Sequence, residues 1–332
     1  MDNTITKKEI DKKIKIHQNS LKKVKHELAK IVVGQDKIID GFLRGLIANG
    51  HILVEGVPGI AKTLIVRALS AIMGCKFSRI QFTPDLLPTD IIGLTTYEKE
   101  RGFYVLKGPI FSNFVIADEI NRAPPKVQSA LLEAMAERQV TIGKETFALP
   151  LPFFVLATQN PIETLGTYPL PEAQLDRFLF KLNITYPNMD EEQVILKRNI
   201  NLKKFEEFNL MPVSSPDDIL ALQQDVNHIY LDRKIERYIV RIVDATRNPS
   251  KYNVKLGKYI DWGASPRATI GMFISSKATA LIKGNAFVTP HYVKEVAPDI
   301  LRHRMLINYE GQSEGITTDK VITEILSKVP VP

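Results

Sequence analysis

The segment at residues 56–63 restricts the fold of this chain more than any other part of the sequence. It reads Gly-Val-Pro-Gly-Ile-Ala-Lys-Thr, follows an apolar run at 51–55 and opens a helical pattern at 64–72. Glycines let backbone N–H groups wrap an anion, and a helix start adds a positive dipole end. A strand, this loop and a helix in that order predict a phosphate-binding loop within an α/β fold.

The side chains of this segment indicate which phosphate compound it holds. Lys62 is expected to reach the β- and γ-phosphates of ATP, and the Thr63 hydroxyl to ligate Mg²⁺. Ala61 stands where the general pattern has its second glycine, and alanine is the smallest substitute for it. The expected nucleotide contacts are Gly56, Val57, Pro58, Gly59, Ile60, Ala61, Lys62, Thr63 and Leu64.

Alternation of short apolar runs with helical stretches predicts a parallel sheet flanked by helices. Two further pairs of short runs, at 94–107 and 139–149, predict β-hairpins. After Pro187 the pattern turns helical. The sequence therefore predicts a basic helical segment at 1–30, a nucleotide-binding core at 31–186 and a smaller all-α lid domain at 187–332. The strand-like runs are 51–55, 77–82, 113–117, 153–157 and 178–184.

Polar residues follow two of these runs. Asp118 and Glu119 end the third run, where the carboxyl edge of a parallel strand positions ligand-binding groups. Asp118 is expected to hold Mg²⁺, and Glu119 to orient or deprotonate the attacking water. Asn160 follows the fourth run and either orients that water or forms an ordinary turn before Pro161, and spacing alone leaves both readings open.

Two arginines are candidates for stabilising the transferred phosphate. Arg177 lies just before the fifth run, and Arg267 opens a predicted helix with Ser265 at its N-cap and Pro266 at its first position. A cation at a helix start is unfavourable unless an anion pairs with it. A structural ion pair explains either arginine equally well, and Trp262 is expected in the core.

Composition excludes several classes of protein. With 44% apolar and 24% charged residues the chain should be globular, and its single cysteine, Cys75, supports neither an internal disulfide nor a zinc site. The net charge of +7 is concentrated at residues 1–30, which hold nine lysines against four acids. No run spans a bilayer and the N-terminus lacks the apolar part of a signal peptide, so a soluble cytoplasmic protein without membrane insertion is expected.

Several motifs resemble those of the MoxR family of AAA+ ATPases. The run Asp-Glu-Ile-Asn-Arg-Ala-Pro-Pro-Lys-Val-Gln is similar to the family's Walker B signature, and the phosphate loop carries the alanine that MoxR proteins commonly have there. Together the matches cover about 33–304 and are highly specific. The matching segments are 56–63, 118–128, 157–161, 170–178, 263–268 and 301–304.

This resemblance implies an AAA+ core with a helical lid and a role for each candidate residue. Asn160 corresponds to sensor 1, Arg177 to the arginine finger and Arg267 to sensor 2. Val33 and Gly34, with Gln35, resemble the segment that contacts adenine. The resemblance also implies a homo-oligomeric ring, usually a hexamer, with ATP and Mg²⁺ between subunits. Family members often act with von Willebrand factor A domain proteins.

The sequence leaves more than one function open. A chaperone-like ATPase that remodels protein clients is the first, and a DNA-acting motor of the same clade is the alternative. Nucleic acid is the less expected partner because the tips of both predicted hairpins, at 98–101 and 143–145, have mixed charge. A scaffold that binds ATP without hydrolysing it is disfavoured by the presence of Glu119, Asn160 and Arg177.

Overall fold

The computed structural model describes residues 7–56, 62–100, 102–160, 166–198 and 204–332. These residues form a parallel five-stranded sheet in the order β2-β5-β8-β1-β9, so the strand that precedes the phosphate loop lies between β8 and β9. The predicted parallel sheet is confirmed, and each strand begins and ends within two residues of its run. The strands are β1 Ile52–Gly56, β2 Phe77–Gln81, β5 Phe114–Asp118, β8 Phe154–Gln159 and β9 Phe180–Ile184.

Both faces of the central strands β1, β5 and β8 are buried, which explains why these strands show nearly continuous apolar runs, whereas the edge strand β2 is largely accessible. Alternate side chains of one strand enter two different cores: Ile52 and Val54 pack on one side of β1 and Leu53 on the other. Helix α5 covers the second side, and α1, α2, α3 and the C-terminal helices cover the first. The helices of this half are α1 Lys7–Leu28, α2 Asp36–Ile47, α3 Lys62–Ile72, α4 Pro88–Ile92, α5 Pro125–Glu137 and α6 Glu172–Leu175.

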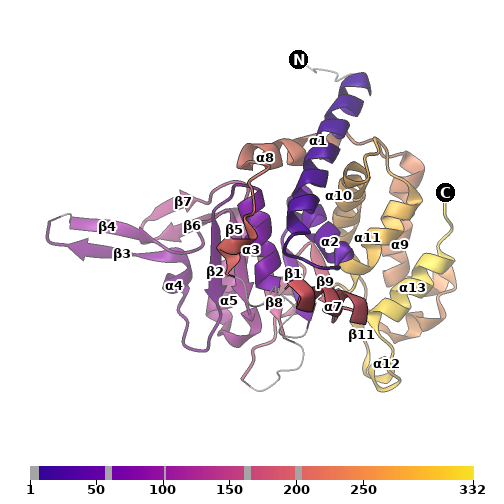
Figure 1. The fold of residues 1–332 in the computed structure, drawn as a ribbon. Helices are drawn as coiled ribbons and strands as arrows, with labels where there is room; N and C mark the ends of the chain where they lie inside the picture. Colours follow the sequence, from indigo (N-terminus) through magenta and orange to yellow (C-terminus); the bar gives the residue numbers. More distant parts are fainter. Residues whose placement is uncertain (1–6, 57–61, 101, 161–165, 199–203) are drawn as a thin grey trace, which may run out of the picture.

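Two antiparallel hairpins interrupt the core, as predicted. Strands β3 (Gly93–Glu98) and β4 (Gly102–Lys107) form a hairpin that projects from the body at the left of Figure 1. Strands β6 (Gln139–Ile142) and β7 (Glu145–Ala148) form the second hairpin at its base, next to α5.

Helices α9, α10, α11 and α13 gather at the right of Figure 1, while α8 lies near the top beside α1 and α7 lies below β9. Their core is continuous with the first core of the sheet, because Ile242 and Ile300 belong to the same buried cluster as Ile52. A two-stranded ribbon joins Trp262 to Leu306. These elements are α7 Met189–Arg198, α8 Pro216–Asp225, α9 Arg233–Arg247, β10 Ile260–Trp262, α10 Pro266–Ile282, α11 Pro290–Leu301, β11 Leu306–Ile307, α12 Tyr309–Ser313 and α13 Thr318–Lys328.

Local signals at the start of α10 act as the sequence predicts. The Ser265 hydroxyl caps the helix by accepting from the Arg267 N–H, and Pro266 occupies the first position. One expectation is wrong: Trp262 is 71% exposed, because it lies on a short ribbon at the edge of the helical domain rather than inside it. None of the helices in the described part of the chain is long and apolar enough to cross a membrane. The boundaries at 30 and 186 stay predictions.

Candidate functional site

Strand order brings four of the predicted residues to one edge of the sheet. Strand β5 ends at Asp118 and is followed by Glu119, while β8 ends one residue before Asn160. Strand β1 ends at Gly56 beside β8, and α3 begins at Lys62. Because these strands are parallel, their carboxyl ends meet at the same edge. Residues 57–61 of the expected phosphate loop lie outside the described residues.

Lys62 is the cation that the phosphate loop brings to this edge. Its ammonium donates to the Gly56 carbonyl oxygen at 2.6 Å. Partial burial lowers the pKa of Lys62, and the negative charges of Asp118, Glu119 and Glu55 oppose that shift. The Lys62 ammonium is partly withdrawn from water and can attract an anion, and the three nearby acids can attract a cation. This combination of charges suits an anion that binds together with its own cation. Thr63, in the first turn of α3, is half-buried.

Asp118 is held from two sides. The Thr158 hydroxyl donates to its Oδ1 at 2.7 Å, and the Arg79 guanidinium donates to its Oδ2 at 2.7 Å and 3.1 Å. Arg79 reaches it because β2 runs beside β5. Thr158 comes from β8 on the other side. The carboxylate is therefore oriented by both neighbouring strands.

Glu119 leaves the strand in a left-handed conformation, with φ of +57°. A non-glycine residue there carries strain on the order of 1–3 kcal/mol, which recurs at functional sites. Its N–H donates to the Thr158 hydroxyl oxygen at 2.9 Å. Its Oε2 accepts from Gln81 at 2.9 Å and lies 3.1 Å from Nε of Arg122. Thr158 thus connects the two acids, and Gln81 fixes the direction of the second.

The two candidate arginines lie in a different cluster, at the junction between the sheet and the helical domain. Asp176 is its centre: Arg304 donates to Oδ1 at 2.7 Å, the Ser265 hydroxyl donates to Oδ2 at 2.9 Å, and Arg267 lies 3.7 Å from the same Oδ2. Asp176 is the anion that a cation at the start of α10 requires. Next to it, Arg177 is exposed and donates to the Leu132 carbonyl at 2.9 Å.

The structure therefore places the predicted residues in two groups. Lys62, Asp118, Glu119 and Asn160 share the carboxyl edge of the sheet. Arg177 and Arg267 have contacts elsewhere, with the Leu132 carbonyl and the Asp176 carboxylate respectively. Sequence reasoning missed Arg79, Gln81 and Asp176 as contacts of the site.

A cleft of about 750 Å³ lies beside the segment at 33–35. It is bordered by Gln35 and α2, by the end of β9 and by Pro298 and Arg302 from the helical domain. Gln35 Oε1 is buried and has no hydrogen-bond partner among the residues described here. Gly34 has φ of +66°, and a Cβ there would meet the Glu191 carboxylate. Gln35 thus brings an unsatisfied acceptor, itself buried from solvent, to the border of a cleft between the two halves of the chain.

No cluster of three His, Cys, Asp or Glu side chains that could hold a metal occurs in the part of the chain that the structure describes. Mg²⁺ is commonly bound by one or two protein ligands, with phosphates and water supplying the rest. Asp118 with Thr63 provides a donor set of that kind, and the nearby Lys62 and acids fit a magnesium–phosphate pair.

Comparison with known proteins gives consistent matches over nearly the whole chain. A family profile described as "ATPase family associated with various cellular activities (AAA)" matches residues 51–180, and one described as "AAA lid domain" matches 257–325. Chaperone MoxR1 of Mycobacterium tuberculosis is 45% identical over 317 residues, which cover 95% of this chain and 83% of that protein.

Two further relatives agree. The uncharacterized protein YeaC of Bacillus subtilis is 45% identical over 313 residues, covering 94% of each chain. A crystal structure of a candidate ATPase from Cytophaga hutchinsonii superposes with a TM-score of 0.91 at 47% identity, covering 98% of each chain. Sequence and fold therefore identify the same family.

Proposed function

Because this chain belongs to the MoxR family of AAA+ ATPases, we propose that it hydrolyses Mg²⁺-ATP between the subunits of a homo-oligomeric ring. Energy from hydrolysis remodels or matures protein clients. One observation carries this proposal: Lys62, Asp118 and Glu119 lie together at the carboxyl edge of the sheet. The strand β1, which leads into the phosphate loop, ends at the same edge.

In this proposal each residue at the carboxyl edge of the sheet has a separate role in ATP binding or hydrolysis. Lys62 exchanges its bond to the Gly56 carbonyl for the β- and γ-phosphates. Thr63 and Asp118 hold Mg²⁺, which neutralises charge on the phosphate oxygens. Glu119 orients the attacking water and accepts its proton, helped by Asn160. Since Gln81 and Arg122 both contact Oε2 of Glu119, we assign the contact with the water to Oε1.

The base of the nucleotide is assigned to the cleft beside Gln35. Its unpartnered Oε1 is an acceptor that is buried in the structure, so a change of side-chain rotamer would be needed to turn it toward the exocyclic amino group of adenine, which is a donor. Guanine presents a carbonyl at the equivalent position, which would face this oxygen unfavourably. Val33 and Gly34 complete the contact, and this arrangement favours ATP over GTP.

Oligomerisation is supported by the position of the two arginines. Arg177 is exposed and remote from the chain's own phosphate edge in the hydrogen-bond network, so it serves the nucleotide of a neighbouring subunit. Arg267 is paired with Asp176 at 3.7 Å and acts from the lid. A ring, with six subunits as in related proteins, supplies each pocket with a neighbour's guanidinium.

Protein clients are favoured over DNA by the surface of the projecting hairpin. Tyr97 and Phe103 pack together near its tip with ring centroids 5.1 Å apart, and Phe103 is 79% exposed. Leu94 and Leu106 are exposed on the same hairpin. Exposed apolar clusters of this kind mark protein contacts, whereas a DNA-tracking hairpin should be basic. Proteins with von Willebrand factor A domains are candidate clients or partners, and the cytoplasm is the proposed location.

Glu119→Gln tests the chemical assignment, because it keeps the shape and hydrogen bonding of the side chain but removes the base. The variant should bind ATP with unchanged affinity by calorimetry and hydrolyse it at least ~10²-fold more slowly. Lys62→Ala, by contrast, should lose ATP binding. Wild-type turnover in Glu119→Gln, or wild-type affinity in Lys62→Ala, would show that the site is elsewhere.

A further inference from the structure

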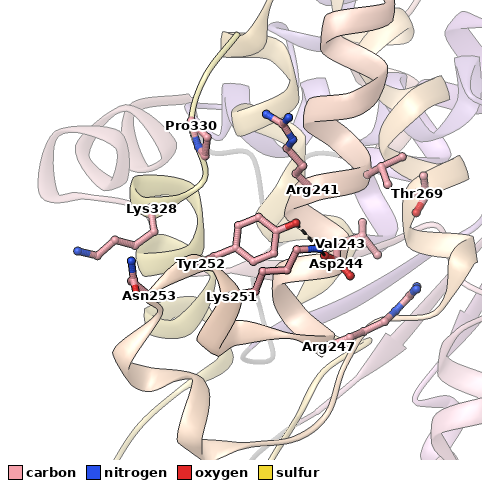
Figure 2. A pocket seen from close by; sticks show the side chains of 11 residues that line it. Arg241, Val243, Asp244, Arg247, Lys251, Tyr252, Asn253, Thr269, Lys328 and Pro330 are labelled. Carbon is pink, nitrogen blue, oxygen red and sulfur yellow. Dashed lines mark hydrogen bonds and ion pairs between the residues drawn. The ribbon is translucent and has the colours of Figure 1, made fainter.

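A hollow of about 820 Å³ lies in the helical domain, between α9, the 3₁₀ turn Pro249–Tyr252 and the C-terminal end of the chain (Figure 2). Its lining includes none of the residues at the carboxyl edge of the sheet. In Figure 1 the elements that form it, α9 and α13, lie on the side of the molecule away from the sheet. The ATPase chemistry therefore does not account for this hollow.

The lining of the hollow is strongly basic. The lining contains one carboxylate, that of Asp244, and four cationic side chains, so it has an excess of three positive charges. The four cations are Arg241, Arg247, Lys251 and Lys328. Figure 2 shows Arg241 and Arg247 at opposite ends, with Lys328 on a third side. The cations surround the hollow rather than converge on one point.

The one carboxylate is already satisfied within the chain. Asp244 accepts from the Tyr252 hydroxyl at 2.7 Å, from the Asn248 amide at 2.8 Å and from the Lys251 ammonium at 3.0 Å. These bonds lower the pKa of Asp244 to about 2. Among the four cations Lys251 is neutralised by this acid and the Arg247 Nε–H donates to the Ala264 carbonyl at 2.7 Å, so Arg241 and Lys328 are the charges most available to a ligand.

A row of arginines on α9 extends the basic surface. Arg233, Arg237 and Arg241 are exposed and spaced four residues apart, so they share one face of the helix over about 12 Å. Like charges at this spacing destabilise a helix. No acid forms an ion pair with any of the three among the described residues. Three exposed guanidinium groups on one face, with no ion pair of their own among the described residues, suit an external anionic partner.

We propose that the hollow, together with this arginine row, docks an acidic segment of a partner protein. A protein segment fits better than a nucleotide or a nucleic acid for three reasons. Spread cations match successive carboxylates better than the single phosphate group of a nucleotide, which needs convergent donors, and the other two reasons concern nucleic acid. The Tyr252 ring is not free for base stacking, because its hydroxyl bonds Asp244 and the Lys251 ammonium lies 5.5 Å from its centroid.

The third reason is the apolar part of the surface. Val240 is 53% exposed at the hollow and offers an apolar contact, and the Asn253 amide and Thr269 hydroxyl can bond peptide groups. The segment that these features recognise alternates acidic with apolar side chains. Such a contact would attach a client or adaptor to the lid, separately from the projecting hairpin.

The test uses the full-length protein and a short fluorescein-labelled peptide of Asp, Glu and Leu, with binding followed by fluorescence anisotropy. Arg237→Gln, Arg241→Gln and Lys328→Gln together should weaken binding about tenfold, the combined scale of three exposed charge contacts. The ATPase rate and circular dichroism of this triple variant should match wild type. A peptide with Asn and Gln in place of its acids should bind to neither protein.

The matched control removes the same charge from exposed positions of α1, as Lys12→Gln, Lys15→Gln and Lys22→Gln. This control should keep wild-type affinity for the acidic peptide. Equal losses in both triple variants would show that only net charge matters and would overturn the proposal. So would undetectable peptide binding by wild type, or a labelled single-stranded DNA that binds more tightly than the peptide and is lost in the α9 variant.

Discussion

Arg304 is the residue whose removal should most weaken the junction between the sheet and the helical domain. Its side chain is only 3% exposed, and besides Asp176 it donates to the carbonyls of Ile300 and Phe178, each at 2.6 Å, and of Leu179 at 3.1 Å. Burial lowers the pKa of Arg304, and the hydrogen bond and charge of Asp176 oppose that shift. Arg304→Met keeps most of the apolar stem and removes every one of these donors.

The expected loss follows from the environment of the partner groups. Removing one member of a buried ion pair typically costs about 3–5 kcal/mol, because the other charge and its acceptors remain. Asp176 would keep the Ser265 hydroxyl and Arg267, so its carboxylate is not stranded. We therefore expect a loss near the lower end, about 3 kcal/mol in the free energy of unfolding.

Urea unfolding measures this loss, with two probes. Trp262 is the single tryptophan and borders the same small hollow as Arg304, so its fluorescence follows the junction, while circular dichroism follows the whole chain. Lys258→Met is the control, since its ammonium lies 3.8 Å from Glu310 with both side chains more than half exposed. The control should change stability by less than ~1 kcal/mol. An equally small effect of Arg304→Met would refute the reasoning.

Three further predictions concern pH, base selectivity and assembly. His51 is fully buried; its Nε2 bonds to the Met135 carbonyl, and its Nδ1 accepts from the Val155 N–H. Burial lowers the pKa of His51 to about 4. Its neutral form is the native one, so its contribution to stability is complete above pH ~6.5 and is lost as pH falls towards 4, by about 3 kcal/mol in all. His51→Gln should flatten the pH dependence of the urea midpoint in that window, and an unchanged slope would contradict this. Gln35→Leu should reduce the preference for ATP over GTP by about 2- to 10-fold in competition binding, the scale of one hydrogen bond, and an unaltered ratio would remove Gln35 from base recognition. Arg177→Ala should bind ATP but hydrolyse it poorly, and mixing it with Lys62→Ala should restore activity once labelled subunits are shown to exchange; a dead mixture would place the finger in cis or require several adjacent intact sites.

Local pattern was enough to predict the elements that carry the site. Short apolar runs predicted the five strands, and Ser265 with Pro266 predicted the start of α10. Trp262 shows the limit of such reasoning, because its size favours burial, whereas a two-residue pairing with β11 leaves it on the surface. Asp176 is a second case: the acid that pairs with Arg267 lies 91 positions away, in a segment whose own pattern indicates only a turn before a strand.

Strand order explains what the sequence could not reveal about the acids. Arg79 and Gln81 are two positions apart in β2, so their side chains lie on the same face of that strand. Nothing in the local sequence indicates, however, that β2 lies beside β5. That neighbour relation puts the Arg79 guanidinium on Asp118 and the Gln81 amide on Glu119. If Asp118 holds Mg²⁺ as proposed, its carboxylate must exchange or share the bonds from Arg79, so β2 sets how readily the acid becomes available. The strength of the metal site then depends on a strand that contributes no ligand to it.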